Sequence, residues 1–238
     1  SQGKLTVTSA SPAGAVEGEK PVVAPALPSR AGWTQLMVEG FEGVWPTGLW
    51  STFDNNGVDY GASNGDFCWD DENWPTGVHS GSWSGWPAGG CADGMDPNSY
   101  YYAPNMDSWA VYGPFDLSDA TSAYFDFYYW SYSEDGWDEF FWGASGDGVN
   151  FSGYAVSGDR RSWHYESLDL SSWLGGSAVW LAFVFQSDST LSDYDGPFVD
   201  DVSLWKETGG GMADWTFMVY LDGDNNLEEA AVGDFLEM

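Results

Sequence analysis

Alternating apolar and polar positions dominate the second half of the chain. Gly, Ser, Asp and Asn fill the connections between these segments, and no helical period longer than two turns intervenes. The segments run over residues 109–117, 123–132, 138–145, 151–158, 162–170, 178–187 and 196–205. Such spacing predicts an all-β fold, a two-sheet antiparallel sandwich of the jelly-roll type over residues 33–207.

One segment indicates where the centre of a sheet lies. In residues 178–187 both alternating sets are apolar, with Val179, Leu181 and Phe183 in one set and Trp180 and Ala182 in the other. A strand that is apolar on both sides is covered on both sides, so we expect it at a central position.

The first half of the sandwich has a weaker pattern. Residues 34–43, TQLMVEGFEG, predict an entry strand. Dense turn signals follow, among them DNNG, SNGD, PAGG and ADGMDP. This stretch has room only for short strands, such as 67–69 and 81–86.

The two ends of the chain differ from the sandwich. Residues 1–32 are rich in Ala, Pro, Val, Ser and Gly and predict a disordered leader or pro-segment, with Lys20 and Arg30 as possible processing points. Residues 208–214 predict a Gly-rich linker. After it, residues 215–238 predict a buried strand, a polar DGDNN turn and the start of a helix. One strand and one partial helix cannot bury a core, so we expect the chain to stop just inside a second domain.

The charge of the chain excludes several function classes. The 37 acidic residues against six Lys and Arg give a net charge of −31, which repels phosphate backbones and anionic lipids. We therefore expect no nucleic-acid partner. No run of about 20 apolar residues is present, so we expect no membrane span. This composition suits a secreted, monomeric protein whose signal peptide preceded Ser1.

The two cysteines, Cys68 and Cys91, lie in irregular sequence without a CxxC pair or a histidine at metal-ligand spacing. In an exported protein these features favour a disulfide between them, worth about 3 kcal/mol by the loop-entropy model. Two free thiols are the alternative.

Three sequence blocks resemble a known family. These are FEGVWPTGLW, then HSGSWSGW leading on to APNMDSWAVYGPFDLSDA, and the closing GPFVDDVSL. In this order they resemble the MAM-like, immune-inhibitor-A-like β-sandwich modules attached to secreted bacterial peptidases. The resemblance implies a jelly roll, often with a structural calcium ion, and no catalysis.

The residues suggest where such an ion would bind. Strict alternation from Phe198 to Leu204 places Asp200 on the apolar face, and a buried lone carboxylate needs a partner. With so few cations in the chain, a calcium ion bound through oxygens fits. Glu42 in the entry strand and Asp201 are the other candidate ligands. The alternative is that Asp200 caps a turn or accepts backbone N–H bonds.

The abundant aromatic residues allow two interpretations. Exposed rows of Trp and Tyr stack on sugar rings in carbohydrate-binding modules, whereas buried ones pack the sandwich core and pin long loops. The sequence favours core packing for most of them. The run Tyr100, Tyr101 and Tyr102 is the best candidate for an exposed binding surface.

Catalytic motifs are absent from the sequence. No GxSxG, HExxH or P-loop occurs. We expect His79 and His164 to be structural, because neither accompanies a nucleophile in a known motif. Chance pairs among this many carboxylates make a glycosidase only a third option.

The tail WTFMVYLDGDNNLEEAA resembles the start of the clostripain family of cysteine peptidases. That resemblance implies a caspase-like α/β domain whose His–Cys dyad lies beyond Met238. Asp222, Asp224 and Asn225 follow the C-terminal end of the predicted strand, the edge where α/β sites form, so they are candidates to border the active site; a purely structural turn is the alternative. The sequence thus predicts a fragment of a secreted bacterial cysteine peptidase, itself inactive. Its sandwich would dock a protein or polysaccharide substrate for the downstream peptidase domain. The alternative is a stand-alone carbohydrate-binding or adhesion module.

Overall fold

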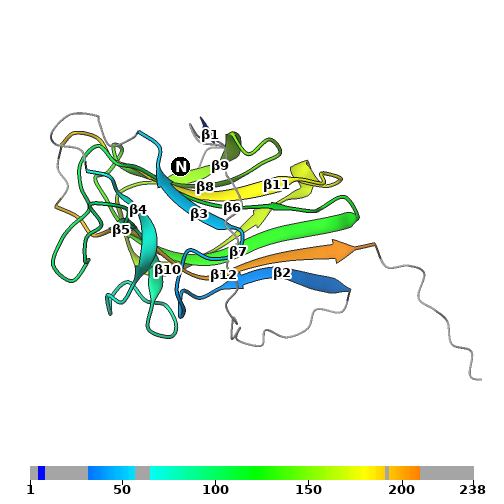
Figure 1. Cartoon of the computed structure of the whole chain (residues 1–238), viewed down its shortest axis with the longest axis horizontal. Coiled ribbons are helices and arrows are strands. Elements are labelled where there is room, and N and C mark those ends of the chain that lie inside the picture. Colours follow the sequence, from blue (N-terminus) through cyan, green and yellow to red (C-terminus); the bar gives the residue numbers. More distant parts are fainter. Residues whose placement is uncertain (1–4, 9–31, 57–64, 191–192, 210–238) are drawn as a thin grey trace, which may run out of the picture.

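The computed structural model describes residues 5–8, 32–56, 65–190 and 193–209, which form two antiparallel β-sheets packed face to face (Figure 1). Sheet A contains, in spatial order, β1 (Leu5–Thr8), β9 (Asn150–Val156), β8 (Glu139–Ser145), β11 (Val179–Gln186), β6 (Asp107–Phe115) and β3 (Trp50–Asp54). Sheet B contains β10 (Asp159–Asp169), β7 (Ala120–Tyr132), β12 (Gly196–Thr208), β5 (Ser84–Gly90) and β4 (Cys68–Glu72), and β2 (Trp33–Glu39) also pairs with β12. The predicted all-β, two-sheet jelly-roll sandwich is therefore confirmed.

The strand that the sequence predicts to be central, residues 178–187, corresponds to β11 and lies inside sheet A. β11 lies between β8 and β6, and Leu181, Phe183 and Phe185 point into the space between the sheets. On the opposite side of β11, Ala182 and Val184 are buried in a second apolar cluster on the outer face of sheet A. Both faces are covered, as the two apolar sets predict.

Aromatic rings fill the interior. The ring of Phe183 has its centroid 4.9–6.1 Å from those of five others, Trp50, Trp69, Phe125, Phe127 and Phe140. Such edge-on and offset pairs add about 0.5–1.5 kcal/mol each beyond the burial of their area. Most of the Trp and Phe residues therefore act in packing, in line with the interpretation that the sequence favours.

The predicted disordered leader contains a strand. Leu5–Thr8 forms β1 and pairs antiparallel with β9, Thr8 lying opposite Asn150. Alternating Thr and Val side chains suit a pleated strand, and the edge of β9 offers unpaired backbone groups. The prediction is wrong for these four residues, while residues 1–4 and 9–31 lie outside the described part.

The loop-rich first half holds more strand than expected. β3 was not among the short strands predicted there, although WSTFD has the required alternation. The strand predicted at 81–86 begins at Ser84 as β5, because a carboxylate on the β2–β3 connection, Glu42, accepts hydrogen bonds from the backbone of residues 82 and 83. The dense turn residues in this part of the sequence made both β3 and the start of β5 hard to predict.

Strand β12 contains a β-bulge that the alternation argument missed. Asp200 lies opposite Tyr128 of β7, but Ser203 lies opposite Asp126, so β12 carries one extra residue, and Asp201 has φ 49°. Phe198 and Asp200 lie opposite Trp130 and Tyr128, on the face of sheet B away from Phe125, and both are fully buried there. The prediction that Asp200 shares a face with Leu204 is wrong, because Leu204 lies opposite the core residue Phe125 on β7.

Candidate ligand-binding surface

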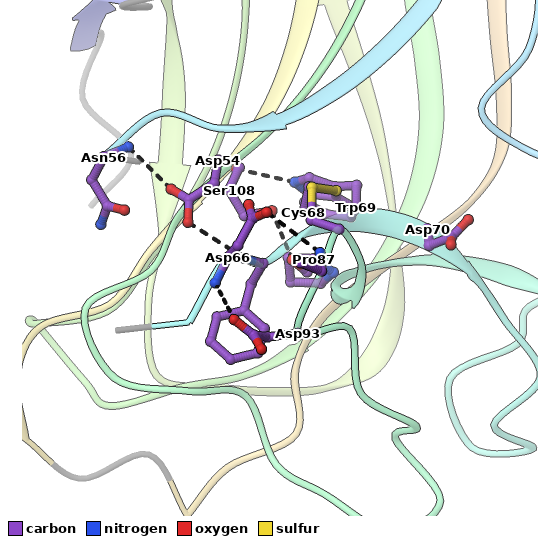
Figure 2. Close-up of a disulfide and its surroundings, with 12 residues drawn as sticks. Asp54, Asn56, Asp66, Cys68, Trp69, Asp70, Pro87, Asp93 and Ser108 are labelled. Atoms are coloured by element: carbon purple, nitrogen blue, oxygen red, sulfur yellow. Dashed lines mark hydrogen bonds between the residues drawn. A yellow bond between two sulfur atoms is a disulfide. The ribbon is translucent and has the colours of Figure 1, made fainter. Parts of the chain in front are cut away.

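A disulfide joins Cys68 at the start of β4 to Cys91 just after β5, with the two Cα atoms 5.3 Å apart (Figure 2). Acidic residues tie the neighbouring loops together: the backbone N–H of Asp66 donates to Asp93 Oδ2 at 2.8 Å, and the N–H of Asp93 donates to the carbonyl of Asp66 at 3.1 Å. Since both cysteines are bonded, neither is available as a thiolate nucleophile.

The three residues predicted to bind metal instead hold one loop, residues 79–83, which we call the clamped loop. Asp200 Oδ2 accepts the backbone N–H groups of His79 and Ser80, each at 2.9 Å. Asp201 accepts the Ser80 hydroxyl at 2.7 Å and lies 2.6 Å from His79 Nδ1. Glu42 Oε1 accepts the N–H groups of residues 82 and 83 at 2.6 and 3.0 Å. These bonds match the alternative in which Asp200 accepts backbone N–H groups.

The environment of Asp200 is electrostatically unusual. Its side chain is fully buried, and desolvation together with the negative charge of Asp201 raises the pKa of this carboxyl to about 7. The N–H bonds from Ser80, Asp201 and His79 act in the opposite direction and limit the shift.

Beside the clamped loop, four aromatic rings contact one another on the outer face of sheet B. We call these rings the outer aromatic cluster. His79 stacks on Tyr128 of β7 at 3.8 Å and lies 5.2 Å from Trp163 of β10. Tyr165 of β10 lies 5.4 Å from Tyr128 and is 53% exposed. Sequence reasoning missed this cluster, because nothing in the spacing shows that residue 79 lies over β7.

The tyrosine run predicted as a binding surface divides into two parts. Tyr100 and Tyr101 are 60% and 52% exposed, as expected for a surface. Tyr102 is buried and donates its hydroxyl to the carboxylate of Asp138, so it is a core residue and this part of the prediction is wrong. Trp137, beside Asp138, is 67% exposed and was not singled out as a surface residue.

Three carboxylates converge at this loop end of the sandwich. Oxygens of Glu134, Asp138 and Asp188 lie within 4.8 Å of one another, a grouping that no other set of three acids, histidines or cysteines matches within the described residues. Burial raises the pKa of Asp138, while bonds from Tyr102 and the N–H of Asp188 oppose the shift. The sequence does not predict this grouping, since strands β8 to β11 separate Asp188 from Glu134 and Asp138 along the chain.

Of the other residues that the sequence singles out, His164 contacts neighbouring side chains, and those near the C-terminus lie outside the described part of the chain. His164 stacks on Tyr129 at 5.2 Å and lies 3.1 Å from the Ser162 hydroxyl. Asp222, Asp224 and Asn225 lie outside the described residues, as does the whole segment 215–238. No helix in the described ranges is long and apolar enough to cross a membrane.

No protein-family model and no curated relative matches the chain. Solved β-sandwich structures do match. The K1 cleaved adhesin domain of Lys-gingipain from Porphyromonas gingivalis W83 is 16% identical with a TM-score of 0.49, covering 74% of this chain and 99% of that one. The family 11 carbohydrate-binding module from Clostridium thermocellum is 14% identical with a TM-score of 0.42, covering 74% and 96%. The chain is similar in fold to these adhesin and carbohydrate-binding domains, and at such scores the likeness carries no argument about function.

Proposed function

We propose that the described sandwich is a non-catalytic ligand-binding module of a secreted protein. The observation that carries the proposal is the set of exposed aromatic rings, including Tyr165, Tyr100, Tyr101 and Trp137, on a frame whose interior is otherwise densely packed. Aromatic side chains are enriched where proteins bind partners, because each covers a large area at a low entropic cost. The disulfide supports export, since disulfides persist in oxidising compartments.

The parent protein that we propose is a clostripain-like cysteine peptidase of a bacterium. Support comes from the block WTFMVYLDGDNNLEEAA after a Gly-rich linker. In such a protein the sandwich would target or dock the substrate of a downstream catalytic domain. A stand-alone carbohydrate-binding or adhesion module is the alternative, and the exposed aromatic rings favour it equally.

Three observations test these proposals. The purified chain is incubated with insoluble polysaccharides and with protein substrates, and retention on at least one of them is expected; no retention on any would reject the binding function. The open reading frame beyond Met238 tests the peptidase context, because a downstream His and Cys in an α/β pattern are expected. Hydrolysis of an arginyl reporter by the chain itself, with loss on mutating Cys68 or Cys91, would contradict a non-catalytic role.

Calcium binding at Glu42, Asp200 and Asp201 stays a prediction, and the described arrangement does not favour it. The oxygens of Glu42 and Asp200 accept backbone N–H groups, whose positive ends would face an ion placed between them. Melting curves recorded with calcium chloride and with EGTA test whether the protein binds calcium. Equal melting temperatures in the two conditions would contradict calcium binding at these residues.

A further inference from the structure

We propose, building on the binding function above, that the outer aromatic cluster on sheet B is the ligand site and that its ligand is a neutral polysaccharide chain. The pyranose rings would stack on Tyr165 and His79, while Asp201 and Ser80 exchange hydrogen bonds with the sugar hydroxyl groups. The four rings come from the clamped loop and from the paired strands β7 and β10, whose ribbons Figure 1 shows, and Asp201 comes from β12.

The four rings contact one another in series. From Tyr165 through Tyr128 and His79 to Trp163, successive ring centroids lie 5.4, 3.8 and 5.2 Å apart, with interplanar angles of 56°, 15° and 60°. Tyr165 is 53% exposed, and 29% of the His79 side chain is accessible. The C–H groups on one face of a pyranose ring can pack on each of these two accessible rings, so neighbouring sugars of one chain would contact Tyr165 and His79.

Polar groups lie within the same surface and select against a purely apolar ligand. Asp201 and Ser80 border the His79 ring, and the Ser167 hydroxyl lies beside Tyr165, donating at 2.5 Å to the buried carboxylate of Asp126. An apolar ligand would desolvate the Asp201 carboxylate without replacing its hydrogen bonds to water. Sugar hydroxyl groups both donate and accept, so they can satisfy this carboxylate while the sugar rings cover the aromatic faces.

Charge restricts the ligand further. The chain carries a net charge of −31, and the carboxylate of Asp201, whose side chain is 23% accessible, belongs to the surface itself. A sulfated or uronic-acid polymer would meet repulsion at short range as well as from the whole molecule. The structure therefore points to neutral chains rather than acidic ones.

The surface is also organised before binding. The backbone of His79 is fixed by Asp200, and its ring is fixed by Asp201 on one side and by Tyr128 beneath it. A ligand that stacks on a ring already held in place loses less free energy to ordering the protein. Asp200 and Asp201 act as positioning residues for the His79 ring.

The test measures binding by isothermal titration with three soluble neutral polysaccharides, namely mixed-linkage β-glucan, xyloglucan and galactomannan, and with polygalacturonate as the acidic comparison. We expect at least one neutral polymer to bind and polygalacturonate not to bind. Tyr165→Ala should weaken binding about tenfold or more, as for an aromatic residue central to an interface, whereas Tyr165→Phe should retain it.

Tyr154→Ala is the matched control, because Tyr154 is a 37% exposed tyrosine on β9 of the other sheet. Its binding should equal that of the wild type, and equal melting temperatures of all variants show that each is folded. Binding lost in a Tyr100→Ala, Tyr101→Ala double variant but retained in Tyr165→Ala would overturn the assignment of the site. No binding of any neutral polymer would overturn the ligand class. If either of these two results is obtained but the chain is still retained on a protein substrate, the proposed ligand-binding function holds while the polysaccharide proposal fails.

Discussion

The disulfide gives the sharpest test of how the loop-rich half of the sandwich is held. We consider the double variant Cys68→Ala, Cys91→Ala, which removes the bond without leaving a free thiol. The linked residues are 23 positions apart, and closing a loop of this length removes about 3 kcal/mol of unfolded-state entropy. The variant should be less stable than the oxidised wild type by this amount.

Local packing adds a smaller term. The Cys68 side chain is 3% exposed, and the space beside Gly90 is tight, since a Cβ there would lie 3.0 Å from the Cys68 sulfur. Losing the buried sulfur leaves a small cavity that costs about 1 kcal/mol more. The total of about 4 kcal/mol corresponds to a melting temperature lower by about 8–16 °C for a protein of this size.

Urea denaturation and calorimetry measure the difference between the oxidised wild type, the reduced wild type and the double variant. The reduced wild type should resemble the double variant, and adding dithiothreitol to the double variant should change nothing. Two free thiols in the denatured, unreduced wild type would refute the bond itself. A stability loss below about 1 kcal/mol would refute the loop-entropy reasoning.

Three further predictions concern buried groups. Burial raises the pKa of Asp200 to about 7, so the native state keeps a proton that the unfolded chain releases near pH 4, and stability should fall as the pH rises through this window. Melting temperatures at pH 5 and pH 8 measure this fall, which Asp200→Asn should reduce. Asp138→Asn replaces an acceptor of the buried tyrosine hydroxyl and should cost about 1–3 kcal/mol in urea denaturation; an unchanged midpoint would contradict the buried bond. Gly153→Ala would place a Cβ 1.8 Å from the carbonyl of Trp142, forcing β8 and β9 apart, and should cost about 3 kcal/mol or more. Gly40→Ala, with nothing within 4 Å, is its control and should melt within a few degrees of the wild type.

Much of the fold could be predicted from the pattern of side chains. β6 to β12 lie where alternation and turn residues place them, because the two-residue period of a strand is written directly in the sequence. β3 and the start of β5 could not be located so well, since dense turn signals overlap the short strands there. The strand at Leu5–Thr8 was hidden because its partner β9 lies far away along the chain, and local composition does not show that pairing.

The residues of the candidate site were much harder to predict from the sequence than the strands, because tertiary contacts bring them together. The sequence by itself determined the sandwich class, the acidic charge and the presence of many aromatic residues. Only the folded chain decided that the bulge at Asp201 places Asp200 on the opposite face of β12 from Leu204, that Tyr102 is buried while Tyr100 is exposed, and that His79 lies on Tyr128. The physical reason is that spacing along a strand records which side chains share a face. It does not record which distant loop covers that face, and that contact decides whether a ring packs the core or meets a ligand.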